Sequence, residues 1–158
     1  MGKVSKDRWA DTRIERAAVL ATERSIIEHT GFVTAQPATD HGIDLLVFKP
    51  EPFAVSPIQV KGAESGLKVM SKYARSPIIL AYVVDPRGDD PLVSIMTGID
   101  AWQLPLEYAR EGGKASDYNP DGETYRWARV TTRLRGILEL RRASEERWSQ
   151  LFEEVGAK

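Results

Sequence analysis

The chain has 158 residues, with 22 Lys+Arg against 23 Asp+Glu, two His and no Cys. This length predicts one domain with a single core, and 42% apolar with 28% charged residues is typical of a globular protein. The lack of Cys excludes disulfides, thiol nucleophiles and Cys-ligated metal sites, and a formal charge of −1 offers no bulk attraction to nucleic acid.

Strong helix formers without Gly or Pro predict a first helix over residues 7–29, ended by Gly31. Leu20 and Ile27 lie seven residues apart and predict its buried face. Glu23 falls between them, so we expect a carboxylate on the buried side of this helix.

Three short strands are predicted next, over 32–36, 43–49 and 54–61. Pro57 lies inside the third strand, which predicts an edge position or a bulge there. A short helix or an irregular segment is expected over 68–75.

The apolar run 78–84 lies between Pro77 and Asp85-Pro86 and predicts a strand buried on both faces, followed by another strand over 92–96. The run is shorter than the roughly 20 residues that span a bilayer, and the first residues contain no apolar segment typical of a signal peptide. We therefore expect a cytoplasmic protein without membrane segments.

The last third of the chain has weaker patterns. A helix over 100–110 is expected to be interrupted by Pro105, a strand is expected over 125–130, and the segment 132–142 is ambiguous because of Gly136. A final helix begins after Ser144. The order of elements predicts an α/β fold with a mixed central sheet flanked by helices, in one domain over 1–158 with a core over 7–97 and an extension over 98–158.

Three polar residues are expected to meet on the second and third strands. If these strands form a hairpin centred on Glu51-Pro52, Asp44 lies opposite Gln59, with Lys61 on the diagonal. Carboxylate and amide oxygens are ligands that suit Mg²⁺ or Mn²⁺, and a nearby amine can stabilise charge on a phosphate. With Glu23 as a second carboxylate, this pattern is typical of metal-assisted phosphodiester hydrolysis.

The strings Gly31-Phe32, Gln36-Pro37, Asp40-His41-Gly42-Ile43-Asp44 and Gln59-Val60-Lys61 resemble the PD-(D/E)XK nuclease superfamily, in the branch where Gln replaces the middle acid. The resemblance covers residues 13 to 84. It implies a restriction-endonuclease-like core of helix, three antiparallel strands, helix and strand.

The resemblance also implies an activity, a Mg²⁺-dependent DNA endonuclease in which Mn²⁺ can substitute. Asp44, Gln59 and the Val60 carbonyl would hold the metal, and Lys61 would be the catalytic lysine. The family's helix acid falls on Leu20 in this sequence, which leaves Glu23, or the more distant Glu15, as a substitute. The resemblance places four further residues near the substrate: Gln36, His41, Lys72 and Tyr73.

Other interpretations remain open at this stage. Leu20 favours a catalytically inactive protein of the same fold that binds DNA or a protein partner. Alternatively, the chain could be a structural or antitoxin-like partner subunit, with the segment after residue 98 as its docking surface. Asp44 could be an ion-pair partner of Lys61, and Gln59 and Lys61 could lie on a solvated strand face. Glu23 could be an ordinary surface charge of the helix.

The near-neutral charge is an average over unlike segments. Residues 85–123 carry nine acids against three bases, whereas residues 126–142 carry six arginines against Glu139 alone. Lys61, Lys68, Lys72 and Arg75 form a second basic cluster. Local fields act within a Debye length of about 8–10 Å, so salt-sensitive binding to a phosphate backbone stays compatible with this charge. Cleavage of both strands of a duplex usually takes two sites, so we expect a homodimer or a higher symmetric assembly.

Overall fold

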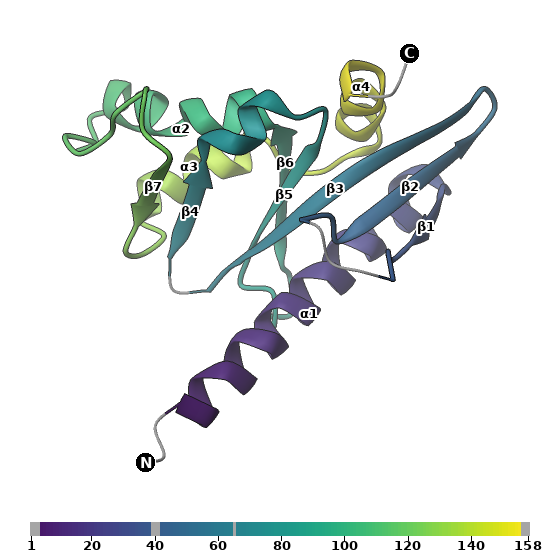
Figure 1. Cartoon of the computed structure of the whole chain (residues 1–158), viewed down its shortest axis with the longest axis horizontal. Helices are drawn as coiled ribbons and strands as arrows, with labels where there is room; N and C mark the ends of the chain where they lie inside the picture. Colours follow the sequence, from purple (N-terminus) through teal and green to yellow (C-terminus); the bar gives the residue numbers. More distant parts are fainter. Residues whose placement is uncertain (1–3, 39–41, 65, 156–158) are drawn as a thin grey trace.

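A mixed five-stranded sheet forms the centre of the computed structural model, which describes residues 4–38, 42–64 and 66–155 (Figure 1). The sheet has the order β1-β2-β3-β5-β6, and only β3 and β5 are parallel. β4 and β7 form a separate two-stranded antiparallel sheet. The strands are β1 (Val33–Ala35), β2 (Leu45–Pro50), β3 (Phe53–Ala63), β4 (Leu67–Met70), β5 (Ile79–Val84), β6 (Leu92–Thr97) and β7 (Thr124–Trp127).

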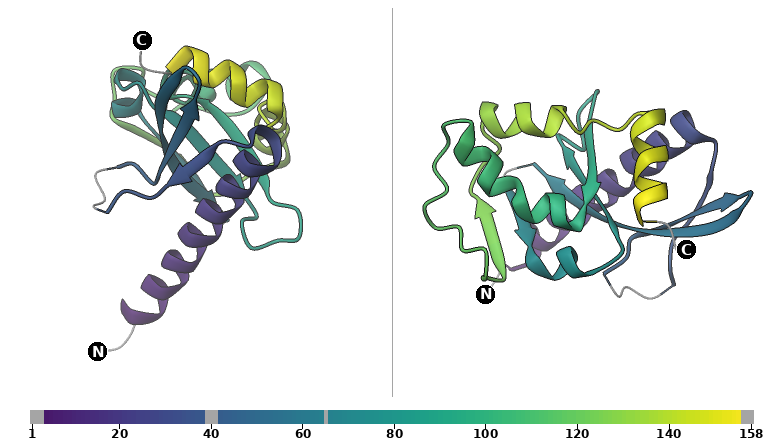
Figure 2. Two further views of the ribbon diagram at one scale, coloured as in Figure 1. Left: turned by 90° about the vertical axis from the view of Figure 1, so that its right-hand side faces the viewer. Right: turned by 90° about the horizontal axis from the view of Figure 1, so that it is seen from above.

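Helices cover both faces of the sheet, which confirms the predicted α/β class. They are α1 (Val4–Thr30), the 3₁₀ turn η1 (Ser71–Arg75), α2 (Gly98–Arg110), α3 (Thr132–Glu139) and α4 (Glu145–Val155). One core cluster joins α1 and α4 to Ile58, Val60 and Ile95, and the other joins α2, α3, β4 and β7 to Leu80 and Tyr82 (Figure 2). Of the described helices, none is long and apolar enough to cross a membrane.

β3 changes partners halfway along its length. Its first half pairs with β2, with Leu45 opposite Ile58 and Pro50 opposite Phe53, the register predicted for a hairpin centred on Glu51-Pro52. Its second half pairs with β5 from Ile58 to Ala63. β2 therefore leaves β3 just where residues 59–61 begin, and in the described residues no strand follows it along that edge of β3.

Pro57 lies in a central strand, so the predicted edge position is wrong and no residue bulges out there. Pro57 pairs with Leu46, and the ladder to β5 begins one residue later, at Ile58. The missing N–H of Pro57 therefore falls before the point at which β3 gains its second neighbour.

The predicted buried face of α1 is also wrong. Leu20 and Ile27 are 48% and 58% exposed, whereas Ala18, Thr22, Ser25 and Ile26 are buried. The two buried polar residues have hydrogen-bond partners: the Thr22 hydroxyl donates to the Ala18 carbonyl, and Ser25 Oγ accepts from the indole N–H of Trp148 on α4. Small satisfied residues let α1 lie close to the sheet, and this pattern has no strong apolar periodicity.

Two predictions for the remaining elements need correction. Residues 67–70 form strand β4, and only 71–75 are helical, because Leu67 and Val69 alternate into the core. Pro105 does not interrupt α2, which continues to Arg110. Leu104 and Tyr108 of that helix are buried in the core, and this packing outweighs the hydrogen bond that Pro105 removes.

An ion-pair network joins α2 to the segment between α3 and α4. The Arg141 guanidinium donates to Asp100 and Glu107, and its side chain is only 14% exposed. Burial alone would lower the pKa of Arg141, but the two carboxylates outweigh it and raise that pKa. The same segment hydrogen-bonds along the outer edge of β6, through Ile95 N to Arg141 O and Ala143 N to Val93 O, and so covers that edge.

Gly98 is a position where packing excludes any side chain. A Cβ there would lie 1.8 Å from the Tyr73 carbonyl oxygen, because α2 begins directly against η1. We expect Gly98→Ala to lower the free energy of unfolding by roughly 2 kcal/mol or more, measured by urea denaturation. Gly136 in α3 is the control, since nothing lies within 4 Å of its Cβ position. There Ala should raise stability by about 0.5–1 kcal/mol, and equal effects at both sites would contradict this account.

Candidate active site

Asp44 is held to β3 at the point where β2 diverges from it. Its N–H donates to the Ile58 carbonyl at 2.9 Å, and its carboxylate Oδ2 accepts from the Val60 N–H at 2.8 Å. The β2–β3 register ends at the Leu45–Ile58 pair, and the Asp44 N–H bonds to Ile58 rather than to Gln59, so the pairing of Asp44 with Gln59 stays a prediction. The carboxylate thus accepts a hydrogen bond from a β3 N–H that β2 no longer pairs with at this point.

Gln59 is a buried amide with an unpaired oxygen. The residue is 5% exposed, so the interpretation of Gln59 as part of a solvated face is wrong. Its Nε2 donates to the Val60 carbonyl at 3.4 Å, but Oε1 has no hydrogen-bond partner among the residues that the structure describes. A Cβ on Gly42 would lie 3.8 Å from this oxygen, so Gly42 borders it. An unpaired buried amide oxygen destabilises the fold, so its retention favours a ligand at this position.

Lys61 lines a cavity of about 260 Å³ between α1, the end of β3, β4 and β7. We name it the Lys61 cavity; among the residues that line it are Asp11, Glu15, Lys61, Lys68, Tyr82 and Arg126. Within the part of the chain that the structure describes, Lys61 forms no ion pair, so Asp44 is not its salt-bridge partner. Gln59 and Lys61 alternate with Ile58 and Val60, which contact the α1 side of the core.

Tyr82 lines the same cavity and is the register partner of Lys61, Tyr82 on β5 and Lys61 on β3. Burial raises the pKa of the Tyr82 phenol well above its usual range, with a smaller effect from Tyr73. The hydroxyl therefore stays protonated and donates to the Lys68 carbonyl at 3.3 Å. This bond ties β4 to the central sheet beside Lys61.

The structure places Glu15, and not Glu23, in the Lys61 cavity. The Glu23 carboxylate accepts a hydrogen bond of 2.8 Å from the Thr34 hydroxyl on β1. Glu15 lies about two turns earlier on α1, where the helix crosses β3: a Cβ on Gly62 would lie 2.7 Å from the Ile14 side chain. The crossing point, which depends on tertiary packing, decides which helix carboxylate lines the Lys61 cavity.

Of the predicted substrate-binding residues, the three that the structure describes do not line this cavity. Lys72 and Tyr73 line a different cavity of about 370 Å³ with Gly42 and Ile43. The Lys72 ammonium lies 5.0 Å from the centre of the Tyr73 ring, and Tyr73 is 6% exposed because its ring belongs to the core. Gln36 is exposed after the end of β1. His41 lies outside the residues that the structure describes.

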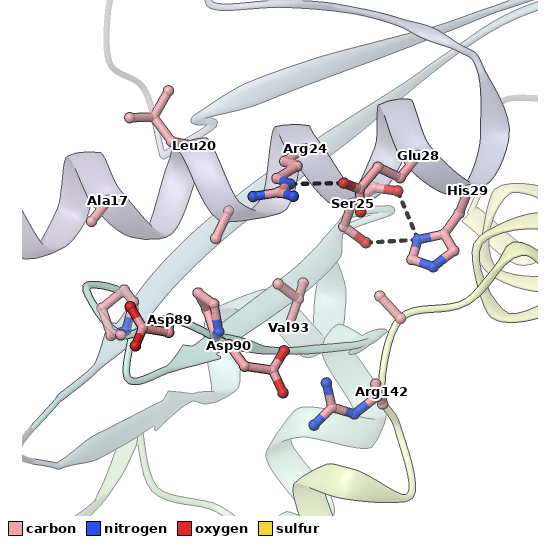
Figure 3. A pocket seen from close by; sticks show the side chains of 15 residues that line it. Ala17, Leu20, Arg24, Ser25, Glu28, His29, Asp89, Asp90, Val93 and Arg142 are labelled. Carbon is pink, nitrogen blue, oxygen red and sulfur yellow. Dashed lines mark hydrogen bonds and ion pairs between the residues drawn. The ribbon is translucent and has the colours of Figure 1, made fainter.

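A larger cavity of about 470 Å³ lies between α1, the loop after β5 and the segment before α4 (Figure 3). Both arginines that line it form ion pairs: Arg24 pairs with Glu28 at 2.7 Å, and Arg142 pairs with Glu139. The His29 ring is held by its own helix, because Nδ1 donates to the Ser25 carbonyl at 2.8 Å. No residue of the Asp44–Lys61 region lines this cavity.

The donor set at Asp44 and Gln59 fits a hard divalent cation. The Asp44 carboxylate, the Gln59 Oε1 and the Val60 carbonyl are all oxygen ligands, and the unpaired buried Oε1 is the observation that supports this fit. The described residues contain no group of three or more His, Asp and Glu that could hold a metal ion. Any such site therefore depends on the amide and on main-chain oxygen.

No protein-family model, curated protein or solved structure matches this chain. Chemical inference about the site therefore depends on its own residues. The sequence placed Lys68 in a basic cluster with Lys61, and Arg126 in an arginine-rich segment, but it did not predict that these residues line one cavity. The alternation Leu67-Lys68-Val69-Met70 is typical of a strand with Lys68 on its outer side.

Gln59 gives a direct test of whether the unpaired amide is kept for function. We expect Gln59→Met to raise the free energy of unfolding by about 1 kcal/mol in EDTA, because it replaces a buried unpaired oxygen with an apolar group of similar volume. Chemical denaturation measures this. Gln103→Met on the exposed side of α2 is the control and should shift stability by no more than about 0.5 kcal/mol. Clear destabilisation by Gln59→Met would show that the amide has a structural role.

Proposed function

We propose that this chain is a metal-dependent DNA endonuclease with a restriction-endonuclease-like core, for which Mg²⁺, or Mn²⁺ in its place, is the cofactor. The observation that carries the proposal is the buried Gln59 Oε1, which has no hydrogen-bond partner among the described residues, at the point where β2 leaves β3. The Asp44 carboxylate bonds to the adjacent Val60 N–H, and Lys61 lies two residues further along β3. The resemblance of Asp44, Gln59 and Lys61 to the PD-(D/E)XK pattern supports the same conclusion.

Each residue has a distinct task in this proposal. Asp44, Gln59 and the Val60 carbonyl would hold the cation, which when bound supplies Lewis-acid polarisation of a phosphate oxygen. The Lys61 ammonium, which has no carboxylate partner among the described residues, is available to donate to a phosphate oxygen and to orient the attacking water. The Val60 N–H keeps the Asp44 carboxylate in place. A two-fold pair of chains would bring one such site to each strand of a duplex.

Plasmid cleavage in Mg²⁺ or Mn²⁺ tests the activity. We expect Asp44→Asn and Lys61→Ala to reduce cleavage at least about 100-fold, because each removes a charge that the reaction needs. Asn keeps an acceptor for the Val60 N–H, whereas Ala would leave that buried donor unpaired. A dimer should release linear product early, and a monomer should first accumulate nicked circles.

The controls for this assay are Asp121→Ala and Lys114→Ala, which change exposed residues outside the Lys61 cavity. Both variants should cleave the plasmid at the rate of the unmodified chain. Equal cleavage by all variants, or no metal-dependent cleavage by any, would reject the enzyme. Duplex binding without cleavage would instead favour the inactive DNA-binding protein, for which Leu20 in place of the family's acid is the supporting observation.

Substitution of the two α1 carboxylates tests which of them assists the reaction. Glu15→Gln should lower cleavage about 10-fold or more, because Glu15 shares the cavity with Lys61 and can hold a water or assist the cation. Glu23→Gln keeps an acceptor for the Thr34 hydroxyl and should change the rate less than about 2-fold. Initial rates of plasmid cleavage measure both. The reverse order would make Glu23 the helix acid and require α1 to move.

A further inference from the structure

Acidic and basic side chains line opposite walls of the Lys61 cavity. Its α1 wall contributes the acids Asp11 and Glu15, and its strand wall contributes the cations Lys61, Lys68 and Arg126. Glu64 also lies there, but its carboxylate is neutralised by Arg87. The strand side therefore presents positive charge with no opposing carboxylate on the same wall.

Lys68 and Arg126 are direct register partners on β4 and β7. Both are exposed, since Leu67, Val69 and Trp127 point into the core from the same strands. In the described residues neither cation forms an ion pair. Two like charges directly opposite each other across a strand pair are destabilising, and a bound anion would remove that penalty.

Most other cations of the C-terminal arginine-rich segment are already compensated. Arg135 pairs with Asp85, Arg141 with Asp100 and Glu107, and Arg142 with Glu139. The six arginines of residues 126–142 are therefore not one basic surface. Arg126 differs from these three because it forms no ion pair with a described residue and lines the Lys61 cavity.

The backbone beneath the two cations is tightly fixed. A Cβ on Gly66 would lie 2.6 Å from the Trp127 carbonyl, so only glycine lets the chain enter β4 this close to β7. The Tyr82 hydroxyl ties the Lys68 carbonyl to the central sheet. Two cations on such a support need little backbone ordering when they bind an anion.

We propose that Lys68 and Arg126 form a phosphate anchor that holds the backbone of a DNA duplex across the strand side of the Lys61 cavity. The inference deepens the proposed function and rests on it for the identity of the polyanion. The two side chains would contact backbone phosphates beside the one that Lys61 faces, and so fix the position of the strand without reading its sequence. They are positioning residues, and they take no part in the bond cleavage itself.

The test is duplex binding in EDTA, measured by fluorescence anisotropy over a KCl titration, with no cleavage required. We expect Lys68→Ala with Arg126→Ala to weaken binding about 10- to 100-fold and to reduce the salt slope by about 2, one for each lost phosphate contact. Lys68→Arg with Arg126→Lys should retain the binding. The melting temperature of the double alanine variant should be unchanged or slightly higher, because the repulsion between two like charges is removed.

The matched control is Arg24→Ala with Arg142→Ala, which removes the same charge from residues of the larger cavity in Figure 3 and should change binding less than about 2-fold. Equal loss in both double variants would reduce the effect to net charge and overturn the anchor, as would unchanged binding after removal of Lys68 and Arg126. Absence of duplex binding by the unmodified chain would overturn it as well. If duplex binding depends on Lys68 and Arg126 but no variant cleaves DNA, the anchor is retained and the enzyme is rejected. If the double alanine variant binds and cleaves DNA as the unmodified chain does, the enzyme is retained and the anchor is rejected.

Discussion

The hydrogen bond from the Val60 N–H to the Asp44 carboxylate is the interaction on which the candidate site depends. β3 has β2 beside it only as far as Ile58, and beyond that point its amide groups need another acceptor. The Asp44 carboxylate supplies it, and this bond fixes Asp44 against β3 where β2 turns away. The neighbouring Gln59 Oε1 is buried and has no hydrogen-bond partner among the described residues. The end of the strand pairing therefore lies beside an unsatisfied polar atom.

The second determinant of the site is the angle at which α1 crosses the sheet. Gly62 lets the helix approach β3 at Ile14, and Glu15 lines the Lys61 cavity next to this contact, while Glu23 bonds to Thr34 on β1. The close approach of the two backbones at a single glycine therefore places a helix acid and the lysine in the same cavity. On the other side of the same cavity, β4 and β7 add cations from segments about sixty residues apart in the chain.

Much of the central sheet could be predicted from sequence, because its cause is local. The register of β2 and β3 follows from a short turn, and burial of β5 on both faces follows from seven consecutive apolar residues. The buried face of α1 could not be predicted, since Thr22 and Ser25 are buried only because Ala18 and Trp148 satisfy their hydroxyls. The strand β4 and the uninterrupted α2 were missed for a similar reason: packing against distant segments outweighs local preference.

By itself, the sequence determined the register of the β2–β3 hairpin, because side chains alternate along a strand and a tight hairpin sets which residues lie opposite. It also determined that the candidate ligands on these two strands are hard oxygen donors. Only the tertiary structure decided that Lys61 lines a cavity with Glu15, Lys68 and Arg126, which Asp44 and Gln59 do not line, and which arginines are neutralised. These contacts join residues that are distant in the chain, and the crossing of α1 and the pairing of β4 with β7 arise from burial of the whole core.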